Sequence, residues 1–170
     1  MVKAIETVYN GYRFRSRLEA RWAIYFDKLR IKYEYEMEGF DLGEAGWYLP
    51  DFYLPRVEMW GEVKARPLTK VELNKAQQLA KLTGEPVLML VGTPDIKNYW
   101  AWEYFLENGE DRFYTCDYIV NLYHNYYFDE NRFYASTGYG EEESIPYDEF
   151  FFDELALEAV LAARQARFGV

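Results

Sequence analysis

The sequence predicts an α/β protein in which a central mixed sheet is flanked by helices. Apolar residues recur at helical spacing over residues 16–29. Two short strand-like segments around a proline form a hairpin pattern over residues 52–60. A strand, a capped helix and a buried strand then follow one another up to residue 91, and this order implies a right-handed crossover with parallel pairing of the two strands.

The first predicted helix is amphipathic and has a well-defined start. Its apolar stripe consists of Leu18, Trp22, Tyr25, Phe26 and Leu29. At its beginning, Ser16 and Glu19 have the spacing of a capping box, in which the glutamate returns to the backbone N–H of the cap residue. Residues 31–38 then alternate tyrosine with glutamate and predict a strand, which leads into a loop over residues 39–46.

The next segment predicts a β-hairpin. Residues 52–54 and 57–60 are rich in the aromatic and apolar residues typical of strands, and Pro55 lies in a turn-like break between them. Such a hairpin is expected to bring Asp51 close to Glu62.

A capped helix and a buried strand follow the hairpin. Thr69 and Glu72 form a second capping-box pattern, and the helix that they open is expected to end near Gly84. The continuous apolar run at residues 87–91 is typical of a buried strand. Parallel pairing with this run would place the second hairpin strand in the interior of the sheet.

The chain is expected to form one structural unit. With 170 residues, of which 50% are hydrophobic, it can bury a sizeable core. We expect this core over residues 1–97 and, packed on it, an aromatic-rich acidic extension over residues 98–170 that ends in a helix over residues 153–167. Cys116 is the only cysteine, which excludes an intramolecular disulfide. The sequence has no signal-peptide or membrane-span pattern, so we expect a cytoplasmic protein with no membrane partner.

The residues with the most specific chemistry are Asp51, in a Pro-Asp pair, and Glu62 and Lys64, in a Glu-x-Lys triplet. Mg²⁺ is a hard cation that binds one or two carboxylates and keeps several waters, and a nearby ammonium can steer the attacking water. Residues at i and i+2 of a strand lie on the same face, so Glu62 and Lys64 would converge on one site while Val63 points into the core. The motif therefore predicts a metal-dependent phosphodiesterase centre in which Asp51 and Glu62 hold the metal.

Each of these residues also has a purely structural explanation. A Glu and a Lys that alternate along a strand are common on a solvated face, and a Pro-Asp at the start of a strand can be simple turn chemistry. Glu19, on the first helix, is the third carboxylate of the predicted site, but the capping box can account for it. The capping role and the site role of Glu19 do not exclude each other.

The order of these features resembles the PD-(D/E)XK nuclease superfamily, whose members have the restriction-endonuclease-like fold. A glutamate on the first helix, a Pro-Asp, a Glu-x-Lys and a following helix occur in this order over residues 9–92. Segments 12–22 and 48–55 are similar to small members of the superfamily in phage and prophage genomes. The exonuclease-like branches carry Gln-x-x-x-Tyr on the last helix, whereas here Gln77 is followed by Lys81, which disfavours a processive exonuclease.

The resemblance implies a role for each residue of the motif. Asp51, Glu62 and the backbone carbonyl of Val63 would ligate Mg²⁺, for which Mn²⁺ would substitute. Lys64 would orient water or stabilise developing charge, and Glu19 would complete the catalytic set, directly or through a water on the metal. The implied activity is that of a metal-dependent endonuclease that hydrolyses DNA phosphodiester bonds.

The net charge of −10 is unevenly distributed along the chain. Residues 1–81 contain 14 Lys and Arg against 12 Asp and Glu, and residues 82–170 contain 5 against 17, so the two parts carry +2 and −12. The acidic part favours a second hypothesis, in which a non-catalytic nuclease fold binds a protein partner through its C-terminal half. The basic residues of the first part are expected to bind DNA phosphates, with a solvated polar face as the alternative. The predicted phosphate-binding residues are Arg15, Arg17, Arg21, Lys28, Arg66 and Lys70.

Overall fold

The computed structural model describes residues 4–56, 58–95, 99–105, 110–116, 126–129, 132–136, 142–146 and 154–169, with side chains described in residues 4–56, 58–95 and 157–169. The first part of the chain forms β1 (Thr7–Tyr9), β2 (Tyr12–Phe14), α1 (Arg17–Lys28), β3 (Glu34–Tyr35), β4 (Phe40–Asp41), the 3-10 helix η1 (Gly43–Ala45), β5 (Trp47–Tyr48), β6 (Phe52–Leu54), β7 (Met59–Lys64), α2 (Lys70–Thr83) and β8 (Val87–Val91). The remainder forms β9 (Tyr99–Phe105), β10 (Glu110–Cys116), β11 (Tyr126–Asp129), β12 (Arg132–Ser136), β13 (Glu142–Pro146) and α5 (Glu154–Gln165).

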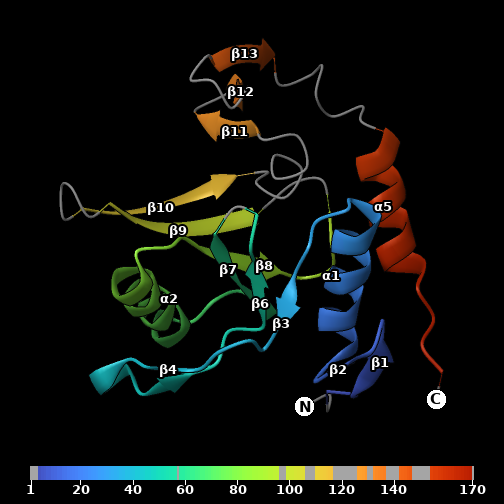
Figure 1. The fold of residues 1–170 in the computed structure, drawn as a ribbon, viewed down its shortest axis with the longest axis horizontal. Helices are drawn as coiled ribbons and strands as arrows, with labels where there is room; N and C mark the ends of the chain where they lie inside the picture. The colour runs from blue at the N-terminus through green and yellow to red at the C-terminus, as the bar shows by residue number, and fades with distance from the viewer. Residues whose placement is uncertain are drawn as a thin grey trace.

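The main sheet has six strands in the order β10-β9-β8-β7-β6-β3 (Figure 1). Strand β7 runs parallel to β8, and the other pairs of this sheet are antiparallel. This mixed sheet confirms the predicted α/β class, the β6–β7 hairpin and the interior position of β7. Strands β9 and β10 belong to the same sheet, so the chain passes the boundary expected at residue 97 without leaving it. Strands β11, β12 and β13 form a separate antiparallel sheet.

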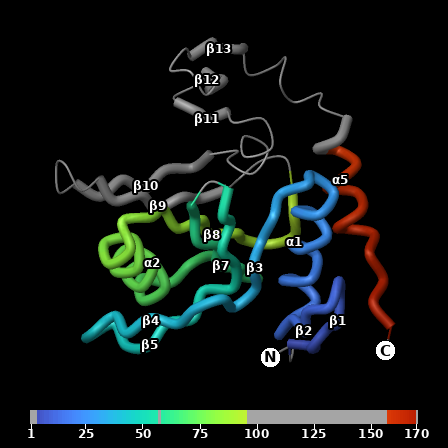
Figure 2. The backbone as a smooth tube through the Cα atoms, viewed as in Figure 1, coloured from blue at the N-terminus to red at the C-terminus, as the bar shows by residue number. Residues whose placement is uncertain are grey.

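Helices cover both faces of the main sheet. Helices α1 and α5 lie on one side of it and α2 on the other (Figure 2). The core on the α1 side includes Trp22, Phe26, Phe52, Val63, Leu88 and Ala163. The core on the α2 side includes Trp60, Ala76, Leu79, Val87 and Met89. Because side chains alternate along a strand, Val63 of β7 enters the first core, whereas Glu62 and Lys64 lie on the α2 side with Trp60.

The two predicted helix starts are both present. Ser16 caps α1, where its hydroxyl accepts from the Glu19 N–H at 3.2 Å. Thr69 and Glu72 form a complete capping box on α2, and Gly84 ends that helix in the left-handed conformation, with a φ of 75°. Glu19 differs from the expectation in one detail, because its carboxylate accepts from the N–H of Arg15, one residue before the cap, at 3.0 Å. None of the helices in the described ranges is both long and apolar enough to cross a membrane.

The strand expected over residues 31–38 is shorter than predicted. Only Glu34–Tyr35 pair with β6, as strand β3. Glu36 has a φ of 47°, which ends the extended conformation, and its N–H donates to the Asp51 carbonyl at 2.9 Å. The loop expected over residues 39–46 contains β4 and η1, and β4 pairs with β5.

Arg21 connects α1 to the end of α5. Its Nη1 donates to the carbonyls of Ala163 and Arg164 at 2.5 and 2.6 Å, and its guanidinium lies 5.7 Å from the ring centroid of Phe168. Carbonyls in the last turn of a helix have no partner within the helix, and a cation at that end is favoured by the helix dipole. The end of α5 is therefore held to α1 by a charged hydrogen-bond donor.

Replacement of Arg21 by Met is expected to lower the free energy of unfolding by about 1–2 kcal/mol, because two helix-end carbonyls lose their charged donor. Urea unfolding monitored by circular dichroism measures this change. Lys32→Met, which removes an exposed positive charge outside the helices, is the matched control and should change stability little. Equal effects of the two substitutions would show that the Arg21 contact does not stabilise the fold.

Candidate active site

The β6–β7 hairpin places Asp51 opposite Glu62. Phe52 pairs with Gly61 in this antiparallel ladder, and continuing the register by one residue brings Asp51 to Glu62. The strands approach closely here, since a Cβ atom at Gly61 would lie 3.3 Å from the Cβ of Phe52. Asp51 and Glu62 are only 4% and 5% exposed. The hairpin thus buries two carboxylates next to each other.

Lys64 lies beside Glu62 on the same face of β7. Its Nζ is 2.5 Å from Glu62 Oε1 and 3.8 Å from Glu72 Oε1. Burial alone lowers the pKa of Lys64, but the charge of Glu62 and its hydrogen bond outweigh burial and raise it, so the ammonium stays charged. Burial also opposes ionisation of Glu72, yet the Thr69 N–H and the Arg66 guanidinium lower the pKa of Glu72 to about 2.

Asp51 accepts hydrogen bonds on both carboxylate oxygens. Oδ1 accepts from Arg15 Nη2 and Oδ2 from the Val63 N–H, each at 2.7 Å. Arg15 also forms an ion pair with Glu36, with Nε 2.5 Å from Oε1. Each buried carboxylate therefore has its own cation: Arg15 for Asp51 and Lys64 for Glu62.

These cations compensate the buried pair only in part. Burial is the largest cause that raises the pKa of Asp51, and the charges of Glu62 and Glu19 raise it further. The Val63 N–H and Arg15 act in the opposite direction, but the pKa of Asp51 remains well above its ordinary value. In addition, Glu62 Oε2 is buried and has no hydrogen-bond partner among the described residues. A small cation placed between the two carboxylates would lower the pKa of Asp51 and give Glu62 Oε2 a partner.

The oxygens of Glu19, the third predicted carboxylate, accept hydrogen bonds from neighbouring residues. Oε1 accepts from the Ser16 hydroxyl at 2.6 Å, and Oε2 accepts from the Arg15 N–H at 3.0 Å and from the Tyr35 hydroxyl at 2.5 Å. Burial and the hydrogen bond to Glu19 raise the pKa of Tyr35, so its hydroxyl remains a donor. The charge of Glu19 acts on Asp51, but its oxygens hold the start of α1.

The donor chemistry of Asp51 and Glu62 fits a hard divalent cation. Mg²⁺ commonly takes one or two carboxylates and completes its coordination with waters, and Glu62 Oε2 offers a buried oxygen with free lone pairs. Oδ1 of Asp51 is occupied by Arg15, whose side chain is 54% exposed and therefore has space to turn away. Within the described ranges, no group of three or more His, Cys, Asp or Glu is arranged to hold a metal ion. Ligation by Glu19 and by the Val63 carbonyl stays a prediction.

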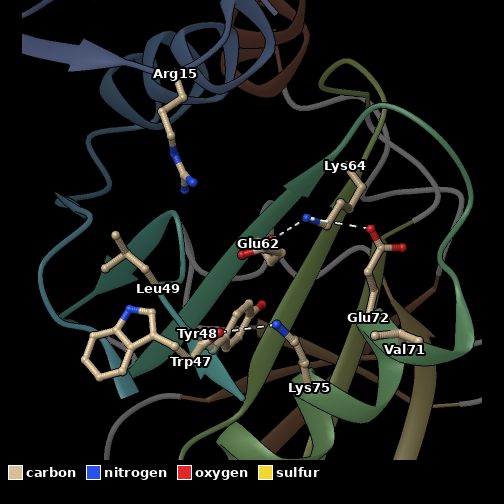
Figure 3. A pocket seen from close by; sticks show the side chains of 9 residues that line it. All are labelled: Arg15, Trp47, Tyr48, Leu49, Glu62, Lys64, Val71, Glu72 and Lys75. Carbon is tan, nitrogen blue, oxygen red and sulfur yellow. Dashed lines mark hydrogen bonds and ion pairs between the residues drawn. The ribbon is translucent and has the colours of Figure 1, made fainter. Parts of the chain in front are cut away.

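A pocket of about 510 Å³ opens at Glu62 of this pair, and Asp51 is not part of its lining (Figure 3). The volume is typical of small-ligand sites. Its lining consists of Arg15, Trp47, Tyr48, Leu49, Glu62, Lys64, Val71, Glu72 and Lys75. Charged side chains of β7 and of the start of α2 form one end, and Trp47 and Leu49 form the other. The Tyr48 hydroxyl points toward Glu62, and burial together with the charge of Glu62 raises the pKa of Tyr48.

The predicted phosphate-binding residues do not form one surface. Arg15 lines the pocket, whereas Arg21 is bound to the carbonyls at the end of α5. Arg66 pairs with Glu72 through both of its terminal nitrogens, at 3.0 and 3.1 Å. The remaining predicted residues are Arg17, which is half-buried, and Lys28 and Lys70, which are exposed. Among the six, Arg15 alone belongs to the pocket lining.

Sequence reasoning missed the aromatic and apolar part of the pocket. Trp47, Leu49 and Val71 were not expected at the site, and Glu72 was expected only as a helix cap. Trp47 and Tyr48 directly precede the Leu-Pro-Asp segment, and this proximity along the chain is the signal that could have found them.

Comparison of the chain with protein-family models, with curated proteins and with solved structures found no match. The assignment of roles to the site residues therefore rests on their geometry and chemistry alone.

Replacement of Asp51 by Asn is expected to raise the thermal midpoint at pH 8 and to change it less at pH 5. The raised pKa means that folded wild-type protein keeps a proton which the unfolded chain loses above pH 3.8. The free energy of unfolding of the wild type therefore falls as the pH rises toward the pKa of folded Asp51. The Asn side chain can still accept from the Val63 N–H but does not titrate, so the variant lacks this loss of stability. Differential scanning calorimetry across this pH range measures the difference. Glu44→Gln, at an exposed position, is the control, and a pH-independent difference for Asp51→Asn would refute the burial argument.

The hydrogen bonds of Glu19 predict that Glu19→Gln folds better than Glu19→Ala. The Gln carbonyl can accept from Arg15 and Tyr35, and its amide can donate to Ser16. Alanine leaves these donors without a partner, at a cost of about 1–3 kcal/mol. Urea unfolding of both variants measures the difference. If Gln destabilises as much as Ala, the negative charge of Glu19, and not its hydrogen bonding, stabilises the start of α1.

Proposed function

We propose that this protein is a Mg²⁺-dependent endonuclease that hydrolyses DNA phosphodiester bonds, on a core of the restriction-endonuclease-like type. The observation that carries this proposal is the buried pair of Asp51 and Glu62 on neighbouring chain segments, with Lys64 on the same face and a pocket lined by Glu62 and Lys64. Burial of two neighbouring carboxylates is unfavourable. A carboxyl group with a strongly perturbed pKa, as Asp51 has, is a candidate for function.

Asp51 and Glu62 are the residues that would hold the cation. When bound, Mg²⁺ supplies Lewis-acid polarisation of a phosphoryl oxygen and a water of lowered pKa. The free Oε2 of Glu62 and the raised pKa of Asp51 support this assignment. The Val63 N–H fixes one oxygen of Asp51 and leaves the other directed at Arg15.

The chain itself provides two cations for the phosphate. Lys64 is kept protonated by Glu62 and is held from the other side by Glu72, so its ammonium is fixed where charge would develop in the transition state. Arg15 reaches the same pocket from the loop before α1 and can bind a phosphate oxygen through its planar guanidinium.

A second candidate function is that of a non-catalytic protein that binds a protein partner through its C-terminal half. The charge of −12 over residues 82–170 favours it, because such a surface repels phosphate backbones. It leaves the buried carboxylate pair without a use.

The proposal predicts cleavage of closed DNA circles that depends on Mg²⁺ or Mn²⁺ and stops with EDTA. Asp51→Asn and Glu62→Gln should each reduce turnover by about 10²-fold or more, because each removes a charged ligand for the cation. Lys64→Met should reduce turnover by a similar factor with little loss of DNA binding, because the ammonium acts mainly on charge that develops in the transition state. Cleavage of supercoiled plasmid and of single-stranded circles, followed on agarose gels, measures the turnover of each variant. Because circles have no ends, they report internal cleavage only.

Lys32→Met, which removes an exposed positive charge that is not part of the pocket lining, serves as the matched control and should cleave like the wild type. Wild-type turnover in either carboxylate variant at saturating Mg²⁺ would refute the assigned site. Absence of any affinity for DNA at low salt, with Ca²⁺ present, would favour the protein-partner hypothesis instead.

A further inference from the structure

We propose that Trp47 is a stacking platform for an unpaired nucleobase, so that the pocket takes a phosphodiester next to a nucleotide that is not base-paired. This inference rests on the proposed function, because it places the base beside the phosphate that Lys64 and Arg15 would bind. It names the class of substrate that the proposed site prefers: single strands, flaps or frayed ends over intact duplex.

Trp47 differs from the other tryptophans whose side chains the structure describes. Trp22 and Trp60 are 0% and 3% exposed and belong to the two cores, whereas Trp47 is 66% exposed. Single exposed apolar residues are common on protein surfaces, but an indole presents a large flat apolar face, and tryptophan is enriched at binding interfaces. Its position is also fixed, because it lies in β5, which pairs with β4.

The indole is held in place by the backbone of Gly39. A Cβ atom at position 39 would lie 2.2 Å from Cζ2 of Trp47 and 2.8 Å from its Cε2, so the ring occupies space that is available only beside a glycine. Lys75 of α2 donates to the Trp47 carbonyl at 3.2 Å and holds the backbone of β5 from the other side. The ring is thereby positioned before any ligand binds.

The pocket combines this ring with the groups that a nucleotide requires. Trp47 and Leu49 form one end of the lining, and Val71 lies at the other end beside Glu72 (Figure 3). The charged side chains of the lining are the cations Arg15, Lys64 and Lys75 and the carboxylates Glu62 and Glu72. Aromatic stacking of bases together with cations that follow the phosphate backbone is the usual way to bind single-stranded nucleic acid. An apolar side chain of a protein partner could contact the indole, but it would not use the excess of positive charge in the lining, where three cations face two carboxylates.

Only an unpaired base can use this platform. In the interior of a duplex both faces of each base are covered by its neighbours, and an enzyme that contacts a base face there must act on single-stranded substrate or extrude the base. The net charge of −10 also disfavours binding that depends on many phosphate contacts along a duplex. Stacking provides affinity that does not depend on phosphate charge.

Fluorescence anisotropy of labelled oligonucleotides with the full chain, in EDTA and at low salt, tests the inference without requiring cleavage. The probes are a short oligothymidylate, its RNA counterpart and a blunt duplex of two complementary strands. The wild type should bind the unpaired probes more tightly than the duplex. Trp47→Ala should weaken binding of the unpaired probes by about fivefold or more and leave duplex binding unchanged, while Trp47→Phe should retain most of the affinity. DNA and RNA present the same kind of nucleobase face. The unpaired probe that binds with the higher affinity shows whether the site prefers DNA or RNA.

Two further variants separate stacking from general effects. Gly39→Ala retains the indole but displaces it, and it should weaken binding to the unpaired probes as Trp47→Ala does. Leu82→Ala removes another exposed apolar side chain, 58% exposed and outside the pocket lining, and should leave binding unchanged. The inference is overturned if Trp47→Ala binds the unpaired probes like the wild type, or if it weakens duplex and unpaired probes equally. Circular dichroism confirms folding of each variant.

A parallel cleavage assay with Mg²⁺ keeps the two proposals apart. Trp47-dependent binding of unpaired probes without any hydrolysis would contradict the proposed function and support the stacking site. Hydrolysis of single-stranded circles with unaltered rates and affinities in Trp47→Ala would support the proposed function and overturn the stacking site.

Discussion

The arrangement of the whole molecule is constrained by two carboxylates that are buried side by side across the β6–β7 hairpin. An ion removed from water loses several kcal/mol of solvation that nearby charges must compensate. Here the compensation comes from separate elements: Arg15 from the loop before α1, Lys64 from β7, and the Val63 N–H from the strand itself. The pair can remain buried only while these elements stay in place.

Both helix starts take part in this support. Glu19, at the start of α1, accepts from the N–H of Arg15 and so fixes the residue that pairs with Asp51. Glu72, in the capping box of α2, lies within ion-pair distance of Lys64. Each cap thus satisfies the end of its helix and also positions a cation of the pocket. Substitution of either glutamate is therefore expected to affect folding and the site together, and the two effects have to be measured separately.

Local patterns predicted the elements that are defined by local physics. The two caps, the apolar strand β8 and the hairpin at Pro55 could all be identified from neighbouring residues, and with them the placement of Asp51, Glu62 and Lys64. The short extent of β3 was not predictable, because glutamate continues to alternate with apolar residues up to Glu38. The backbone, however, turns to a positive φ at Glu36.

The partners of the charged residues were less accessible to sequence reasoning. Arg15 and Asp51 are 36 residues apart, and Arg21 and Ala163 are 142 apart, so no periodicity or spacing connects them. Arg21 was expected on a phosphate-binding face because it shares that face with Arg17, but its hydrogen bonds are made to the end of α5. Trp47 follows a glycine-containing loop that shows no strand pattern, and its place at the pocket depends on pairing of β4 with β5.

The continuation of the sheet from β8 into β9 has a consequence for how this chain can be divided. Strand β8 carries Val87, Leu88, Met89 and Leu90, all fully buried, and pairs with β7 on one side and β9 on the other. A fragment that stopped after β8 would present an apolar strand with a free row of backbone donors and acceptors, which is a template for aggregation. Strand β9 therefore shields β8, and a fusion or domain transfer that ended after β8 would have to provide a substitute for β9.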